Sequence, residues 1–247
     1  MSIINKLLGK DRRLKNPVSI PVKTDIHSHL IPGIDDGSQS LEESIHLIKK
    51  LYQLGYRKII TTPHIMGDHF RNNTQIITDG LKIVQDEVAK QGIDVVLEAA
   101  SEYYIDDHFM KLLEKDDILS FGDRYVLVET NAINYTELIR NAFWQMGLSG
   151  YKPIFAHPER YSYLWNDFDR YHEFHDMGIF LQINLVSLSG FYSQKVKEIA
   201  ERLIDENLVS FIGTDTHEMR YIEGIHESLH SPYMNKLKDM KLLNDTL

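Results

Sequence analysis

The sequence of 247 residues contains no cysteine. This absence excludes disulfide bonds, thiolate metal ligands and a cysteine nucleophile. Cationic side chains are also scarce, because 27 Lys and Arg stand against 36 Asp and Glu, a formal net charge of −9. Nucleic-acid binding needs a surplus of Lys and Arg to neutralise phosphates, so this balance argues against a nucleic-acid partner.

Long apolar runs are missing as well. No stretch of about 18 consecutive apolar residues occurs, which predicts that the chain has no transmembrane segment. The first residues, MSIINKLLGKDRRLKNP, lack the apolar core of a secretory signal. These two absences favour a cytoplasmic location.

The N-terminus differs in composition from the rest. Residues 1–21 are predicted to form an arm that precedes a single domain at 22–247. Residues 1–15 combine Lys and Arg with Ile and Leu, which is compatible with a weak amphipathic anchor at the inner membrane surface. The alternative, a solvated and partly frayed arm, is favoured because chain termini are commonly poorly ordered.

From residue 22 onward, short β-branched runs alternate with longer amphipathic stretches. Strands are predicted at 22–26, 58–61, 94–97, 125–129, 153–156, 179–183 and 209–213. Helices are predicted at 40–54, 74–91, 135–147, 167–178 and 192–207, with a short helix and loop within 104–124. Strict alternation implies parallel strands with right-handed crossovers, in either a doubly wound sheet or a barrel. No Gly-rich phosphate loop follows the first strand, so the favoured class is α/β, a single distorted (β/α)7 TIM-like barrel.

Possible metal ligands follow six of the seven predicted strands. They lie in the segments 25–29 (DIHSH), 35–37 (DDG), 62–64 (TPH), 101–102 (SE), 129 (Glu), 157–160 (HPER) and 213–217 (GTDTH). In a barrel of parallel strands the carboxyl ends meet at one face, where loops build the site. His-x-His on an extended segment also places two imidazoles on the same side. Each motif alone is more often structural, and DDG also reads as a turn, but their shared position at strand ends indicates one site.

The number of candidate ligands exceeds the coordination capacity of one ion. Five histidines and four or five carboxylates imply two or three divalent cations, and the nitrogen and oxygen donors suit Mn, Fe or Zn, with Mn or Fe favoured by the carboxylates. Clustered cations activate a water and bind an anionic substrate, which suits phosphoryl transfer. Arg160 and Arg220 each lie three residues beyond a candidate histidine and could bind phosphate oxygens, or form surface ion pairs instead.

Taken together, DIHSH, IDDG, TPH, Glu102, Glu129, HPER and GTDTH resemble the motifs of the PHP (polymerase and histidinol phosphatase) superfamily. Their order and spacing are most similar to its bacterial manganese-dependent tyrosine-protein phosphatases of capsule and exopolysaccharide operons, the CpsB/CapC type. The stretch DIHSHLIPGIDDGSQSLEES carries the most specific part of the resemblance, which covers about residues 23–221. Residues 129–131 and the loop after His217 depart from the usual pattern of that family.

The resemblance implies three metal ions in a (β/α)7 barrel. It assigns the first ion to His27, His29 and Asp215 with a bridging Glu102, the second to Glu102, Glu129 and His157, and the third to Asp36, His64 and His217. Arg160 and Arg220 would match phosphate-binding arginines.

The resemblance also implies a substrate, namely phosphotyrosines on the tail of a membrane-linked tyrosine kinase that governs polysaccharide synthesis. The chemistry agrees, because a phenolate with a parent pKa of about 10 leaves with little proton assistance. We therefore expect direct attack by a hydroxide that bridges the metal ions, with no phospho-enzyme. The sequence leaves the oligomeric state open.

Three other functions remain open from the sequence. The same site could act on another phosphoester, such as histidinol phosphate or a nucleic-acid 3′-end, the latter made less attractive by the negative net charge. A metal-dependent amide hydrolase would need a bridging lysine that is not evident. A non-catalytic scaffold for a kinase is disfavoured by the complete set of candidate ligands.

Overall fold

The computed structural model describes residues 13–247. The amphipathic anchor predicted within residues 1–15 falls mainly on residues 1–12, which lie outside the described part. Residues 14–22 run along the body of the protein, where the amides of Leu14 and Val18 donate to the carbonyls of His230 and Leu229. Val22 is buried in the core. None of the described helices is long and apolar enough to cross a membrane.

Within residues 13–247, nine short strands pair in parallel in two sheets. The three-stranded sheet has the order β1 (Thr24–Asp25), β2 (Lys58–Thr61), β4 (Val96–Ala99). The six-stranded sheet has the order β3 (His64–Ile65), β5 (Glu102–Tyr104), β6 (Tyr125–Glu129), β7 (Lys152–Ala156), β8 (Phe180–Asn184), β9 (Val209–Gly213). The predicted α/β class with parallel strands is confirmed.

Two of the predicted strands continue from one sheet into the other. The chain leaves β2 at Thr61 and enters β3 at His64 after Pro63, which has no amide hydrogen for a sheet ladder. Similarly, two residues separate the end of β4 from the start of β5. The strand β4 starts at Val96 rather than at the predicted residue 94. A continuous closed sheet is not found in the described residues. The outer strands β1 and β9 meet beyond their ends, at a parallel bridge between Ser28 and Thr216.

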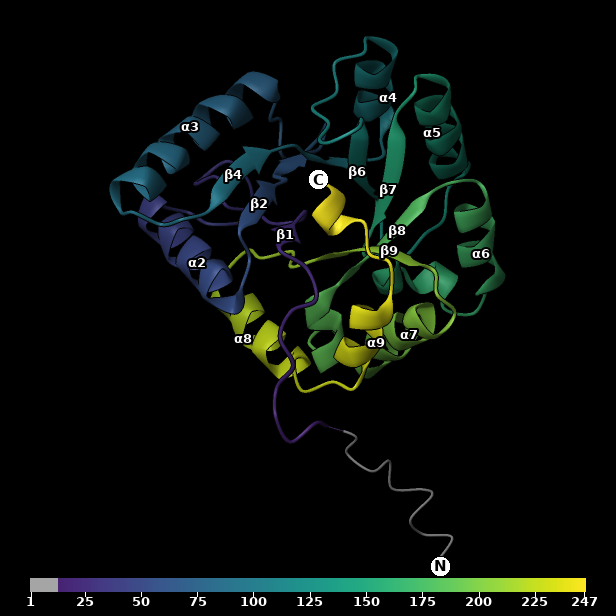
Figure 1. Cartoon of the computed structure of the whole chain (residues 1–247). Helices are drawn as coiled ribbons and strands as arrows, with labels where there is room; N and C mark the ends of the chain where they lie inside the picture. The colour runs from purple at the N-terminus through teal and green to yellow at the C-terminus, as the bar shows by residue number, and fades with distance from the viewer. Residues whose placement is uncertain (1–12) are drawn as a thin grey trace, which may run out of the picture.

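Helices surround the strands (Figure 1). They are α2 (Leu41–Leu54), α3 (Thr74–Lys90), α4 (Asp107–Glu114), α5 (Glu137–Leu148), α6 (Asp169–Asp176), α7 (Gln194–Asp205), α8 (Met219–Ser228) and α9 (Tyr233–Asp239). The start of α2 is set by Ser40, whose side chain accepts from the Glu43 amide, and its end by Gly55 in the left-handed region. Gly147 was predicted as the last residue of its helix, but it lies inside α5. The glycine with a positive φ beyond this helix is Gly150.

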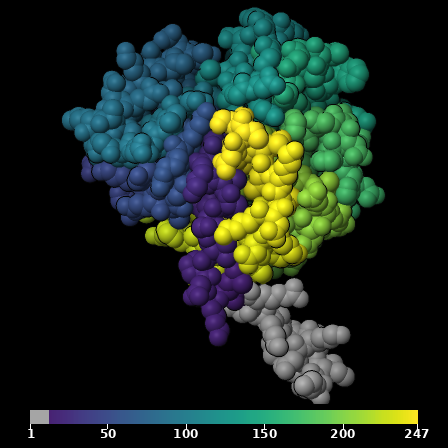
Figure 2. Space-filling view, viewed as in Figure 1, coloured from purple at the N-terminus to yellow at the C-terminus, as the bar shows by residue number. Residues whose placement is uncertain are grey.

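The core has two parts. The larger cluster lies between the helices and the strands. The smaller one joins side chains of different strands, including Ile60, Ile154 and Phe211, with Ile26, which follows β1. The C-terminal segment lies over the middle of the strands and beside the first described residues (Figures 1 and 2). Its Leu247 packs against the smaller cluster. The C-terminal segment therefore covers part of the smaller cluster.

Candidate metal centre

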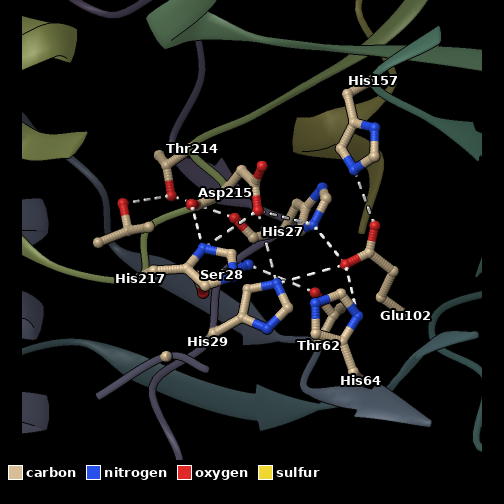
Figure 3. Close-up of polar contacts among 12 residues, drawn as sticks. His27, Ser28, His29, Thr62, His64, Glu102, His157, Thr214, Asp215 and His217 are labelled. Carbon is tan, nitrogen blue, oxygen red and sulfur yellow. Dashed lines mark hydrogen bonds and ion pairs between the residues drawn. The ribbon is translucent and has the colours of Figure 1, made fainter. Parts of the chain in front are cut away.

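The predicted ligands converge at the carboxyl ends of the strands, around one carboxylate (Figure 3). Glu102, the first residue of β5, is fully buried. Its Oε2 lies 3.1 Å from Nε2 of His27, 3.3 Å from Nε2 of His29 and 3.3 Å from Nδ1 of His64. Its Oε1 lies 3.0 Å from Nε2 of His157. One carboxylate thus contacts four imidazoles that reach it from three segments of the chain, because His27 and His29 lie in the same one.

The described residues contain three overlapping groups of possible ligands. Within each group, the ligand atoms all lie within 4.8 Å of one another. They are His27–His29–Glu102–Asp215, His29–Asp36–His64–His217 and His64–Glu102–Glu129. His157 lies beside the third group, with Nε2 at 3.8 Å from Oε2 of Glu129. All nine side chains predicted as metal ligands are therefore neighbours in space, and each group could hold a divalent cation.

The groups resemble the division implied by the family resemblance, with three differences. His157 lies outside the group that contains Glu129. His29 belongs to two groups, and His64 faces both sides: its Nε2 lies 3.5 Å from Oδ1 of Asp36 and its Nδ1 lies 3.2 Å from Oε1 of Glu129. The assignment of each residue to one particular ion remains a prediction.

Burial and charged neighbours shift the pKa values of the groups in the centre. Burial lowers the pKa of His27, but the carboxylates of Glu102 and Asp215 outweigh this effect and raise that pKa to about 10. Burial disfavours ionised carboxylates too, yet the neighbouring imidazoles hold the pKa of Asp215 well below its usual range. For His157, burial and the charge of Arg160 lower the pKa, which favours a neutral imidazole. Anionic oxygens beside imidazole nitrogens are the donors that divalent cations require.

Asp35 orients two of the imidazole-bearing residues, a role that the sequence analysis did not assign to it. Its Oδ2 lies 2.8 Å from Nδ1 of His29 and accepts from the His64 amide at 3.1 Å. The turn at Asp35–Gly37 is tight, because a Cβ on Gly37 would lie 2.3 Å from the carbonyl oxygen of His29. The segment DDG therefore forms a turn and also supplies side chains to the metal centre. In the sequence, the position of Asp35 next to Asp36 was the signal that could have pointed to this role.

Another unassigned carboxylate ties the first strand to the last. Both side-chain oxygens of Asp25 accept from Thr214, one from its amide and one from its hydroxyl. The amide of Asp215 in turn donates to the carbonyl of His27 at 2.7 Å. Burial raises the pKa of Asp25 to about 6, against the opposing effect of the Thr214 hydrogen bonds. These contacts align the His27 and Asp215 segments with each other.

A cavity of about 220 Å³ opens onto the candidate ligands. Arg160 lines it, with Nη1 at 3.3 Å from Oδ2 of Asp215 and its guanidinium 4.6 Å above the ring of Tyr192. An apolar wall is formed by Met66 and Phe70. The ring of Phe70 stacks on His64 with centroids 5.4 Å apart and an interplanar angle of 11°. The cavity is therefore lined by a cationic side chain, an aromatic ring and carboxylates of the candidate ligands.

Arg220 does not line this cavity. Its side chain is 63% exposed, and its Nε lies 2.6 Å from Oε1 of Glu218. It borders a separate hollow of about 560 Å³ with Phe191 and Lys197. The two arginines predicted together thus occupy different places, and phosphate binding by Arg220 remains a prediction.

Buried histidines and carboxylates at the ends of parallel strands, beside a cavity with an arginine, define an α/β protein with a candidate multinuclear metal centre. The family model described as "Capsular polysaccharide synthesis, CpsB/CapC" matches residues 23–235. The chain belongs to this family.

Similar proteins include two named phosphatases. The chain is 30% identical over 222 residues to the tyrosine-protein phosphatase CpsB of Streptococcus pneumoniae, which covers 87% of this chain and 88% of that protein. It is 27% identical over 197 residues to the tyrosine-protein phosphatase YwqE of Bacillus subtilis, covering 79% and 78%.

A solved structure shares the fold. Crystal structures of YwqE from Bacillus subtilis and CpsB from Streptococcus pneumoniae, described as unique metal-dependent tyrosine phosphatases, include a chain that matches with a TM-score of 0.79 and 25% identity. The match covers 90% of this chain and 94% of that one.

Proposed function

We propose that this chain is a metal-dependent protein-tyrosine phosphatase. The observation that carries the proposal is the contact of Glu102 with four imidazoles beneath a cavity that Arg160 lines. The names of the relatives support the same activity. Lack of cysteine excludes the cysteinyl-phosphate route, so the reaction would proceed without that covalent intermediate.

We infer that residues 22–247 form one catalytic domain, a distorted (β/α)7 barrel. Counting β2 with β3 and β4 with β5 reduces the nine strands to seven, the number predicted from the sequence. The meeting of β1 and β9 at the Ser28–Thr216 bridge supports closure of the ring at the end where the ligands lie.

The metal centre would hold two or three divalent cations, with Mn favoured over Fe and Zn. Its ligands would be His27, His29, Asp36, His64, Glu102, Glu129, His157, Asp215 and His217. Such cations lower the pKa of a bound water towards neutrality and offset the charge of a phosphoryl group. The donor set of nitrogen and oxygen atoms without sulfur fits these cations.

The side chains around the cavity would position the substrate. Arg160 would donate from its guanidinium to non-bridging phosphoryl oxygens, as planar guanidinium groups do in pairs of hydrogen bonds. The apolar wall of Met66 and Phe70 would contact the phenyl ring of the phosphotyrosine. A phenolate leaving group needs little protonation, so the absence of an evident general acid is no obstacle.

The biological substrate that we propose is a phosphotyrosine protein, namely the tail of a membrane-linked bacterial tyrosine kinase that controls capsule or exopolysaccharide synthesis. The family description supports a role in capsular polysaccharide synthesis. The protein would then act in the cytoplasm, at the inner surface of the membrane.

The test compares two substrates and three metal states. Purified protein is assayed with a phosphotyrosine peptide and with histidinol phosphate, as isolated, with EDTA, and with Mn²⁺ restored after EDTA. We expect peptide hydrolysis that EDTA abolishes and Mn²⁺ restores. Faster turnover of histidinol phosphate would favour a small-molecule phosphatase. Activity that EDTA leaves unchanged would reject the metal centre, and absence of activity in every state would favour a scaffold.

A second measurement tests direct hydrolysis. Rapid acid quench during turnover of a ³²P-labelled peptide should leave no label covalently bound to the protein. Stoichiometric labelled protein would refute direct attack by water-derived hydroxide.

A further inference from the structure

The strand β8 is the one predicted strand whose end supplies no candidate metal ligand. It nevertheless places two amide side chains, Gln182 and Asn184, next to the metal centre. They are two residues apart, so they point to the same side of the strand. Both are completely buried. Buried amides need hydrogen-bond partners, and here the partners are the ligands themselves.

The two amides connect His27 to Asp215 in a continuous chain of hydrogen bonds. Nδ1 of His27 lies 2.9 Å from Oε1 of Gln182. Nε2 of Gln182 donates to Oδ1 of Asn184 at 2.9 Å, and Nδ2 of Asn184 donates to Oδ2 of Asp215 at 2.7 Å. We call this chain the β8 relay.

The β8 relay has only one workable direction. Oδ2 of Asp215 also accepts from Tyr192 and Arg160, so Asn184 turns its NH₂ group to this acceptor and its carbonyl to Gln182. Gln182 then donates to Asn184 and presents its own carbonyl to His27. A carbonyl in that place requires a proton on Nδ1 of His27, so Nε2 is the nitrogen that would give its lone pair to a bound cation. Nε2 is the atom that faces Glu102 and Asp215.

At the other end of the relay, the two side-chain oxygens of Asp215 have different partners. Oδ2 accepts from Asn184, from the hydroxyl of Tyr192 at 3.1 Å and from Nη1 of Arg160 at 3.3 Å. Oδ1 instead faces the imidazoles, at 3.2 Å from Nε2 of His27. Three donors therefore occupy one oxygen and leave the other directed at the place where cations would bind.

The neighbouring strand makes room for the relay. Gly213, the last residue of β9, has no side chain where a Cβ would lie 2.7 Å from Nε2 of Gln182 and 2.7 Å from Cβ of His27. Even alanine would push the amide or the imidazole aside. The absence of a side chain at Gly213 therefore leaves the space in which the amide of Gln182 and the imidazole of His27 lie.

We propose that Gln182 and Asn184 are positioning residues that set the tautomer of His27 and the orientation of Asp215 for metal binding. This inference rests on the metal centre of the proposed function. Hydrogen-bond partners behind metal ligands typically change metal affinity by about 10- to 100-fold.

The first test is the variant Gln182→Met, which keeps the length of the side chain but removes its hydrogen bonds. We expect Mn²⁺ affinity, measured by titration calorimetry on EDTA-treated protein, to fall by about 10- to 100-fold. The control is Gln85→Met on α3, whose amide donates to the Leu97 carbonyl away from the centre, and which should bind Mn²⁺ as the wild type does. Thermal melting in EDTA identifies the folded variants. Wild-type affinity in folded Gln182→Met would overturn the proposal.

The second test uses Asn184→Ala and the double variant. If the relay acts as one unit, the losses of Mn²⁺ affinity will be less than additive, since either change breaks the same chain. The visible absorption of the Co²⁺-loaded proteins should also change in each variant, because it reports ligand geometry. Fully additive losses with an unchanged Co²⁺ spectrum would overturn the relay. Should the wild type bind no Mn²⁺, the metal centre itself fails and the relay with it; binding by all forms alike refutes the relay alone.

Discussion

The two ends of the strands bury different kinds of side chain. Where β6 and β8 begin, Tyr125 and Phe180 join an apolar cluster that the C-terminal Leu247 also contacts. Where the same strands end, Glu129 and Asn184 join the polar centre. The comparison separates an end that stabilises the fold from an end that holds charged groups for function, a division known from barrels of parallel strands. Changes at the two ends should therefore have different consequences.

The largest effect is expected from His27→Ala, which removes a ligand from the centre. Activity on a phosphotyrosine peptide should fall at least about a thousandfold, because cations contribute several kcal/mol to such reactions. Measured metal content should fall as well, while the far-ultraviolet circular dichroism stays unchanged. The matched control is His46→Ala, an exposed histidine on α2. Activity within tenfold of wild type would contradict the assignment of His27.

The C-terminal segment that packs on the apolar cluster is tested by Asn244→Ala. Asn244 is fully buried in the 3₁₀ segment Asn244–Thr246, donates to the carbonyls of Thr24 and Ile212, and accepts from the Ile212 amide. Its loss leaves buried backbone groups unpaired and should lower the free energy of unfolding by about 3 kcal/mol.

Urea denaturation measures that change. At a temperature where the variant is folded, its kcat and Mn²⁺ affinity should equal those of the wild type. Asn235→Ala, an exposed position on α9, is the control for stability. A loss of metal binding in folded Asn244→Ala would show that the two ends are not independent.

An intermediate effect is expected at Arg160. Arg160→Lys keeps the charge but loses the planar pair of donors, so kcat/KM should fall by about 10- to 100-fold. Arg220→Lys supplies the comparison, since Arg220 is exposed and lies outside the cavity, and its kcat/KM should change by less than about threefold. Equal losses in both variants would support the sequence-based prediction that the two arginines act together on phosphate.

The smallest effect concerns the aromatic wall. Phe70→Ala should raise KM for a phosphotyrosine peptide by about five- to tenfold, since a ring contact contributes about 1 kcal/mol. The kcat should change little, and Phe70→Tyr should restore KM. Turnover of a phosphoserine peptide should not respond to the substitution. A fall in kcat with constant KM would instead indicate that Phe70 acts through His64, on which it stacks.

Most of the helices and strands could be predicted because their patterns are local. The strand at 125–129 has the predicted bounds, and α2 ends at the predicted residue 54. The short strand β3 beyond Pro63 was not predicted, because its two residues are too few to show a pattern. Helix α8 was not predicted either, although it follows the GTDTH motif directly.

The ligands could be proposed from sequence because histidine and aspartate at strand ends are an unusual local signal. Their partners could not. Gln182 and Asn184 lie within a predicted strand, where amides have no distinctive pattern, and their role appears only when His27 and Asp215 lie on either side. Arg220 shows the reverse case, since its spacing equals that of Arg160 but its side chain points elsewhere.

The sequence by itself determined the alternation of strands and helices and the residue types at the strand ends, because periodicity and ligand chemistry act over a few neighbouring residues. Only the tertiary structure decided which nitrogen of His27 faces the carboxylates, which oxygen of Asp215 stays open, and which arginine reaches the cavity. These choices depend on hydrogen bonds between residues up to 188 positions apart in sequence, as between His27 and Asp215, whose distance no local pattern encodes.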